Sequence, residues 1–144
     1  MSNYILTSNG ELYHYGVKGM KWGVRRTQRK LNRAAKTAAK QAKHRRNTAN
    51  DYKRVLKDIK SGDYKKYGYP SAERAKQDIP LNDAMIRSEI NIAKNWTKIH
   101  NKIMKMSIND VAEAKALIKK GKQYAYDMDL DIQARIEYES KKFR

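Results

Sequence analysis

Residues 27 to 60 read TQRKLNRAAKTAAKQAKHRRNTANDYKRVLKDIK, and this stretch decides the fold. Its apolar residues recur at alternating steps of three and four, which is typical of one face of a helix. The stripe consists of Leu31, Ala35, Ala38, Ala42, Ala49, Tyr52, Leu56 and Ile59, and Arg45 is its one break. Alanine favours helix but buries little surface. We therefore expect a basic helix that is weakly anchored as far as Asn50 and docks from Tyr52 onward.

The segment that follows predicts further helices. Residues 61–70 form a loop by their Gly and Pro content. A short helix is expected to begin at Ser71 and to stop before Pro80. Asn82 is the predicted N-cap of a core helix that reaches about Met106. Large apolar residues keep helical spacing along this helix, so it is the best candidate for the centre of the core.

The core helix carries one of the two tryptophans. Trp96 lies on its apolar stripe and is expected to be buried, whereas Trp22 is expected to be more accessible. Another helix is predicted to begin at Asn109 or Asp110. Gly121 follows two lysines and indicates the end of that helix.

Residues 124–138 allow two interpretations. Tyr and aliphatic residues alternate with mainly polar ones, which is typical of a half-buried strand. Met128, Ile132 and Ile136 also satisfy a helical step of four. We predict the strand, with the N-terminal hairpin as its neighbour, and keep the helix as the alternative.

Residues 4–15 predict a β-hairpin, because Asn9-Gly10 is a favoured two-residue turn and β-formers flank it. The predicted fold class is therefore mainly α with a minor β part. A long basic helix and two or three further helices would accompany the hairpin. The expected organisation is a hairpin plus a glycine-aromatic segment (1–26), the basic helix (27–60), and a helical core region (61–144).

The composition indicates a polyanionic partner. Among 144 residues, 33 are Lys or Arg and 15 are Asp or Glu, which gives a formal net charge of +18. Such an excess points first to nucleic acid and second to an anionic membrane. Cysteine is absent, so disulfides and thiolate metal sites are excluded. The sequence has no apolar run of membrane-spanning length and no signal-peptide pattern, which predicts a cytoplasmic protein.

The positive charge is concentrated near the N-terminus. Residues 1–60 hold 16 cations and 3 acids, a balance of +13, and no acid lies between Glu11 and Asp51. A solvated helix face normally mixes signs, so this run favours polyanion binding over a merely solvated face. The candidate nucleic-acid-binding residues are Lys18, Lys21, Arg25, Arg26, Arg29, Lys30, Arg33, Lys36, Lys40, Lys43, Arg45 and Arg46.

Residues 13–26 read YHYGVKGMKWGVRR and form a glycine-aromatic box. Three glycines among large aromatics predict a specific irregular backbone. We interpret the box as a docking element for a partner, and the alternative is a structural turn pinned by Trp22. The candidate docking residues are Tyr13, Tyr15, Gly16, Gly19, Trp22 and Gly23.

The box also carries a resemblance. Residues Glu11 to Arg26 resemble a short box found in tailed-phage and prophage proteins of Gram-positive hosts, many of them encoded near head and minor structural genes. The resemblance implies a phage or prophage origin and does not imply a reaction.

No catalytic or metal-binding pattern is visible. His14, His44 and His100 are isolated in sequence. The Asp127-x-Asp129-x-Asp131 run begins like a calcium loop, but Ile132 stands where that loop needs Gly and Tyr138 where it needs Glu. We therefore predict no enzyme activity, no metal and no cofactor.

Aromatics and lysines also interleave in the loop at Tyr64, Tyr67 and Tyr69. This arrangement suits base stacking beside phosphate contacts. The alternative is a loop folded back onto the core by its own rings, and we favour that alternative.

The function expected from these observations is binding. We predict a phage- or prophage-encoded basic protein that engages DNA or RNA largely without sequence specificity, in association with the virion head. One alternative is an inhibitor of a host defence complex, similar to anti-CRISPR proteins, that blocks a nucleic-acid channel or an acidic protein surface. A membrane-surface binder ranks last, because the alanine-rich face is too thin for strong insertion.

Overall fold

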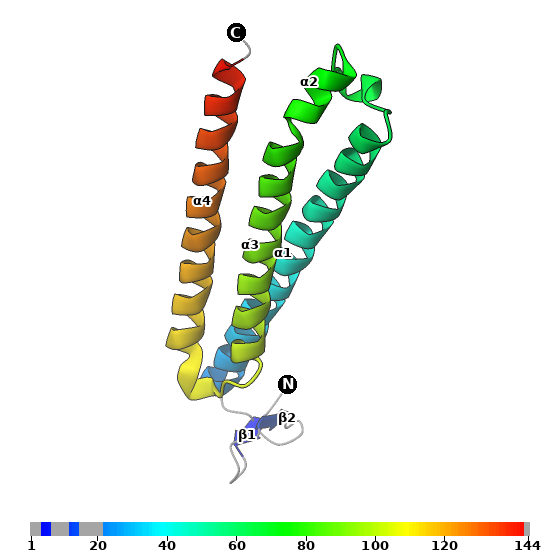
Figure 1. Ribbon diagram of the computed structural model, residues 1–144. Coiled ribbons are helices and arrows are strands. Elements are labelled where there is room, and N and C mark those ends of the chain that lie inside the picture. The colour runs from blue at the N-terminus through cyan, green and yellow to red at the C-terminus, as the bar shows by residue number, and fades with distance from the viewer. Residues whose placement is uncertain (1–3, 7–11, 15–21, 143–144) are drawn as a thin grey trace.

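The computed structural model describes residues 4–6, 12–14 and 22–142 (Figure 1). Three long helices lie side by side: α1 (Trp22–Lys60), α3 (Ile79–Ile103) and α4 (Val111–Lys141). α3 runs opposite to the other two. The short helix α2 (Ala72–Gln77) and a 3-10 turn (Lys65–Tyr67) connect α1 to α3, and a second 3-10 turn (Ile108–Asp110) leads into α4.

The core lies where the alanine stripe of α1 faces α3. Ala38 and Ala42 are fully buried, and on α3 Trp96 is only 1 % exposed. Small side chains on α1 leave room for the large ring and the isoleucines of α3, so the helices pack closely. The expectation of weak anchoring before Asn50 is therefore wrong. The central cluster comprises Leu31, Ala35, Ala38, Ala42, Ile92, Trp96, Ile99, Ile103, Ala114 and Ala125.

Gly121 does not end a helix, which corrects the sequence-based prediction. α4 passes through it without interruption. A Cβ at this position would lie 2.7 Å from Cζ3 of Trp96 and 2.7 Å from Cδ1 of Ile99. The absence of a side chain thus serves the close approach of α4 to α3.

The predicted C-terminal strand is also wrong, because residues 124–138 belong to α4. Met128, Ile132 and Ile136, spaced by four, are partly buried. The intervening Tyr126, Leu130 and Tyr138 are 59 %, 49 % and 63 % exposed. The strict alternation therefore places apolar residues on two sides of a helix. Among the described residues, no sheet lies beside this segment to receive a strand.

Two three-residue strands, β1 (Tyr4–Leu6) and β2 (Leu12–His14), pair antiparallel, with Ile5 opposite Tyr13. In the described residues they pair only with each other and add no layer to the helical core. The mainly α prediction agrees with the structure. Its α+β component is corrected, since the fold rests on helices and the C-terminal partner of the predicted sheet is helical.

The helix starts differ in part from the expected ones. α1 begins at Trp22, five residues before Thr27, and includes the last five residues of the box. Ser71 caps α2 as predicted, and its Oγ accepts a hydrogen bond of 3.1 Å from the backbone N–H of Arg74. α3 begins at Ile79 rather than after Asn82. Its proline stands in the first turn, where the missing N–H costs no hydrogen bond.

Candidate nucleic-acid interface

The exposed side of α1 carries a row of cations that we call the outer stripe. Its members recur at steps of three and four, as the buried alanines do, but on the opposite side of the helix. At a rise of about 1.5 Å per residue, neighbouring charges stand about 5 Å apart along the axis. The outer stripe consists of Arg26, Arg29, Arg33, Lys36, Lys40 and Lys43, all of them exposed, and Lys30 is exposed beside it.

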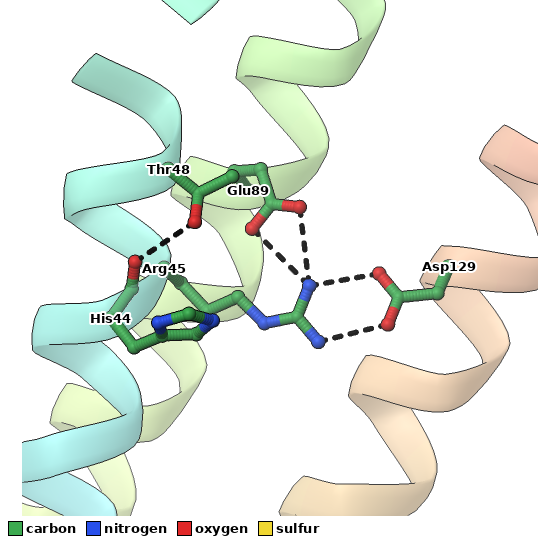
Figure 2. A network of polar contacts seen from close by, with 5 residues as sticks. All are labelled: His44, Arg45, Thr48, Glu89 and Asp129. Carbon is green, nitrogen blue, oxygen red and sulfur yellow. Dashed lines mark hydrogen bonds and ion pairs between the residues drawn. The ribbon is translucent and has the colours of Figure 1, made fainter. Parts of the chain in front are cut away.

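Arg45 is part of the protein interior instead. Its Nη1 donates to both carboxylate oxygens of Glu89 on α3, at 3.1 and 3.2 Å. The same guanidinium forms a fork with Asp129 of α4, through Nη1 at 2.9 Å and Nη2 at 2.8 Å. Figure 2 shows this network, which joins all three long helices. The one break in the apolar stripe is thus an interhelical ion-pair site.

Two of the three side chains in this network are shielded from water. The side chains of Arg45 and Glu89 are only 17 % and 12 % exposed. The hydrogen bond with Asp129 raises the pKa of Arg45, against the opposing effect of burial. Nearby, burial and the negative charge of Glu89 raise the pKa of the Tyr52 hydroxyl. The charge of Arg45 is already neutralised inside the bundle. We therefore leave Arg45 out of the proposed nucleic-acid contacts.

Arg46, the next residue, points to a different side of α1. Its Nη2 donates to Oγ1 of Thr97 on α3. This contact sets the basic part of α1 beside a second run without acids, which extends from Ile90 to Asn109 on and after α3. The second run contributes Lys94, Lys98, Lys102 and Lys105, all exposed. We did not identify these lysines from the sequence, although the absence of acids between Glu89 and Asp110 was a usable signal.

The fold gathers the net charge at one end of the bundle. The first part of α1, the last part of α3 and the first part of α4 lie together at the end next to β1 and β2 (Figure 1). Residues 22–50 and 90–126 hold 18 cations and 2 acids, a balance of +16. Residues 51–89 and 127–142 hold 12 cations and 12 acids, a balance of zero. The Arg45 network lies at the border between these two halves.

Part of the glycine-aromatic box lies in α1. Trp22 is 59 % exposed, and the guanidinium groups of Arg25 and Arg26 stand 5.4 and 5.9 Å from its ring centroid. Gly23 is helical, which corrects the irregular backbone predicted for that end of the box. The predicted residues Tyr15, Gly16, Lys18, Gly19 and Lys21 lie outside the described residues. For Tyr13 the structure describes the strand and not the side chain.

Two tyrosines of the α1–α2 connection bond to nearby acids, while Tyr67 remains 36 % exposed, so the packing of this loop onto the core stays a prediction. The hydroxyl of Tyr67 donates to Asp58, and that of Tyr69 donates to Oδ2 of Asp78 at 2.7 Å. The hydrogen bonds from Tyr67 and Lys66 lower the pKa of Asp58. Burial and the bond to Asp78 raise the pKa of Tyr69 to about 12.

The histidines and acids show no common site in the described part of the chain. Nδ1 of His100 lies 2.9 Å from the backbone oxygen of Ala35, so this ring links α3 to α1. His44 is exposed. Among the described residues, no group of three His, Cys, Asp or Glu side chains could hold a metal ion. Within the same residues, none of the helices combines the length and hydrophobicity that crossing a membrane requires.

Comparison with known proteins gives one match. Residues 6–29 match a family of unknown function, DUF7211. The match begins at the last residue of β1, covers β2, the box and the first turns of α1, and leaves the rest of the bundle outside it. No curated protein and no solved structure matches the chain.

Proposed function

We propose that this chain is a phage- or prophage-encoded basic protein that binds nucleic acid through its phosphates, largely without sequence specificity. It would act in the host cytoplasm and associate with the virion head. The phage origin rests on the resemblance of residues 11–26, and the nucleic-acid partner rests on charge. The glycine-aromatic box would dock a protein or nucleic-acid partner.

The single observation that carries the proposal is the charge imbalance between the two halves of the bundle. In residues 22–50 and 90–126, 18 cations face only 2 acids. Like charges at helical spacing repel one another by a few tenths of a kcal/mol per pair. A bound phosphate backbone relieves this repulsion and releases its condensed counterions. The outer stripe offers regularly spaced cations to such a backbone.

The test is a salt titration of binding to a fluorescein-labelled DNA duplex, read by fluorescence anisotropy. The logarithm of affinity should fall linearly with the logarithm of salt, with a slope of about 0.9 per phosphate contact. Replacing Arg29, Arg33 and Lys36 by Gln should weaken binding and reduce that slope by about one unit per lost contact. All three side chains are exposed, so the fold should persist.

A matched control removes three charges from the other half of the bundle. Lys65, Lys76 and Arg135 are exposed, and replacing them by Gln lowers the net charge by the same amount. This control should retain most of the affinity. Equal loss in both triple variants would mean that only net charge matters, and no binding of the unaltered protein at low salt would refute the proposal.

A further inference from the structure

Three hollows that share lining residues form what we call the trough: the first lies over α3, the second lies between α1 and α3, and the third lies along α1 and Ser61 alone. None of the lining residues belongs to the outer stripe. The first hollow, of about 590 Å³, is lined by Arg46 of α1, by residues of α3 from Asn91 to Asn101, and by Tyr124 of α4. A second hollow of about 380 Å³ shares Arg46 and Lys94 with the first. A third of about 420 Å³ shares Lys53 with the second and reaches Lys60.

The trough is basic throughout. Arg46, Lys53, Lys57 and Lys60 border it from α1, and Lys94 and Lys98 border it from α3. None of the residues that line the three hollows, all in the described part of the chain, is Asp or Glu. From Arg46 to Lys60 the trough follows about 20 Å of helix. A chain of phosphates could therefore be accompanied by cations over its whole length.

The first hollow adds groups that a phosphate does not need. Asn91, Asn95 and Asn101 place amides along it, and each amide can both donate and accept hydrogen bonds. Tyr124 supplies an aromatic ring at its α4 side. Amide groups read the edges of unpaired bases, and an aromatic ring stacks on their faces.

The hollows favour a single strand over a duplex. Each is an open depression of several hundred Å³, the volume range of small-molecule sites, which suits one or two nucleotides. A duplex is far wider and would meet the convex outer stripe instead. We infer that the α1–α3 trough is a binding site for single-stranded nucleic acid, in which Lys94 and Lys98 contact phosphates and Tyr124 stacks on a base.

This inference rests on the proposed function. Variants of two pairs of lysines allow the inference and the proposed function to be tested separately. Lys94 and Lys98 line the trough, whereas Lys36 and Lys40 belong to the outer stripe. Each pair is exposed and spaced by four on a helix, so the double Gln variants lose the same charge from similar settings. Both variants are titrated with a labelled 20-nucleotide oligothymidine and with a labelled 20-base-pair duplex.

The trough variant K94Q/K98Q should bind the oligothymidine at least tenfold more weakly and the duplex at most threefold more weakly. The stripe variant K36Q/K40Q should show the opposite ranking. Equal losses of oligothymidine affinity in both variants would overturn the trough while leaving the proposed function intact. If the unaltered protein binds the duplex but not the oligothymidine, the trough is likewise excluded, and if it binds neither, both proposals fail.

A second comparison leaves the charge unchanged. Y124A removes the ring beside the trough, and Y126A removes an exposed ring two residues away on another side of α4. Stacking on one base corresponds to a loss of about fivefold or more. Y124A should lose at least fivefold in oligothymidine affinity while Y126A stays within twofold. Equal affinities of the two variants would contradict the role of Tyr124.

Discussion

The indole of Trp96 occupies the space in which a side chain at Gly121 would stand. An added Cβ would lie 2.7 Å from Cζ3 and 2.8 Å from Cη2 of that ring. This relationship sets the distance between α3 and α4. It also explains why a residue that usually ends helices stands within one that runs from Val111 to Lys141.

Gly121→Ala should therefore destabilise the protein. Overpacking costs about 1–3 kcal/mol and outweighs the gain of roughly 0.5–1 kcal/mol that alanine brings to a helix. The free energy of unfolding is measured by urea denaturation. Gly23→Ala is the control, because a Cβ there would have no neighbour within 4 Å. It should leave the stability unchanged or raise it, and an equal effect of both substitutions would contradict the packing account.

Arg45→Ala should cost about 3–5 kcal/mol, because it leaves the carboxylate of Glu89 buried without a partner. Arg54 is the matched control, since its ion pair with Asp51, at 2.7 Å, is largely exposed. Such surface pairs contribute about 0–1 kcal/mol, so Arg54→Ala should lie within that range. Chemical denaturation of both variants measures the difference, and similar small losses would show that the Arg45 network is not stabilising.

The two tryptophans should differ in stability and in accessibility. Trp96→Ala should cost about 3–5 kcal/mol because it empties the centre of the core, whereas Trp22→Ala should cost little. Acrylamide should quench Trp22 in the Trp96→Phe variant more strongly than it quenches Trp96 in the Trp22→Phe variant. The exposed fractions of 59 % and 1 % set this order, and a reversed order would contradict the described packing.

Tyr69 should make the stability depend on pH in the alkaline range. Its pKa is raised from 10.0 to about 12 in the folded protein, so folding favours the neutral phenol. This contribution is fully present below pH 10 and is lost as the pH rises toward 12. Between these values the unaltered protein should lose more stability than Tyr69→Phe does. Parallel stability curves for the two proteins would exclude the effect.

The sequence predicted the helices where its periodicity was unambiguous. The apolar stripe of α1 and the position of Trp96 follow from steps of three and four, and the structure confirms both. From the sequence, Arg45 was a break in the stripe and a candidate nucleic-acid contact, because its partners Glu89 and Asp129 lie 44 and 84 residues away. A local pattern carries no information about such contacts.

The C-terminal segment misled the prediction for a physical reason. Tyr126, Leu130 and Tyr138 produce a period of two, but they remain largely exposed on α4. The period that matters is the step of four through Met128, Ile132 and Ile136, the partly buried residues of the same helix. Lys94 and Lys98 were missed in a similar way, since the packing of α3 against α1 joins two acid-free runs that are separate in the sequence.

The unequal halves of the bundle also make the molecule an electric dipole. Because one half carries a net charge of +16 and the other half none, the protein rotates in the field of a charged partner before the two make contact. Near a polyanion, this torque presents the end that holds the start of α1 and leaves the far ends of α2 and α4 directed outward. The protein is then oriented while it approaches the polyanion. The association rate should therefore be high at low ionic strength and should fall as salt screens the field.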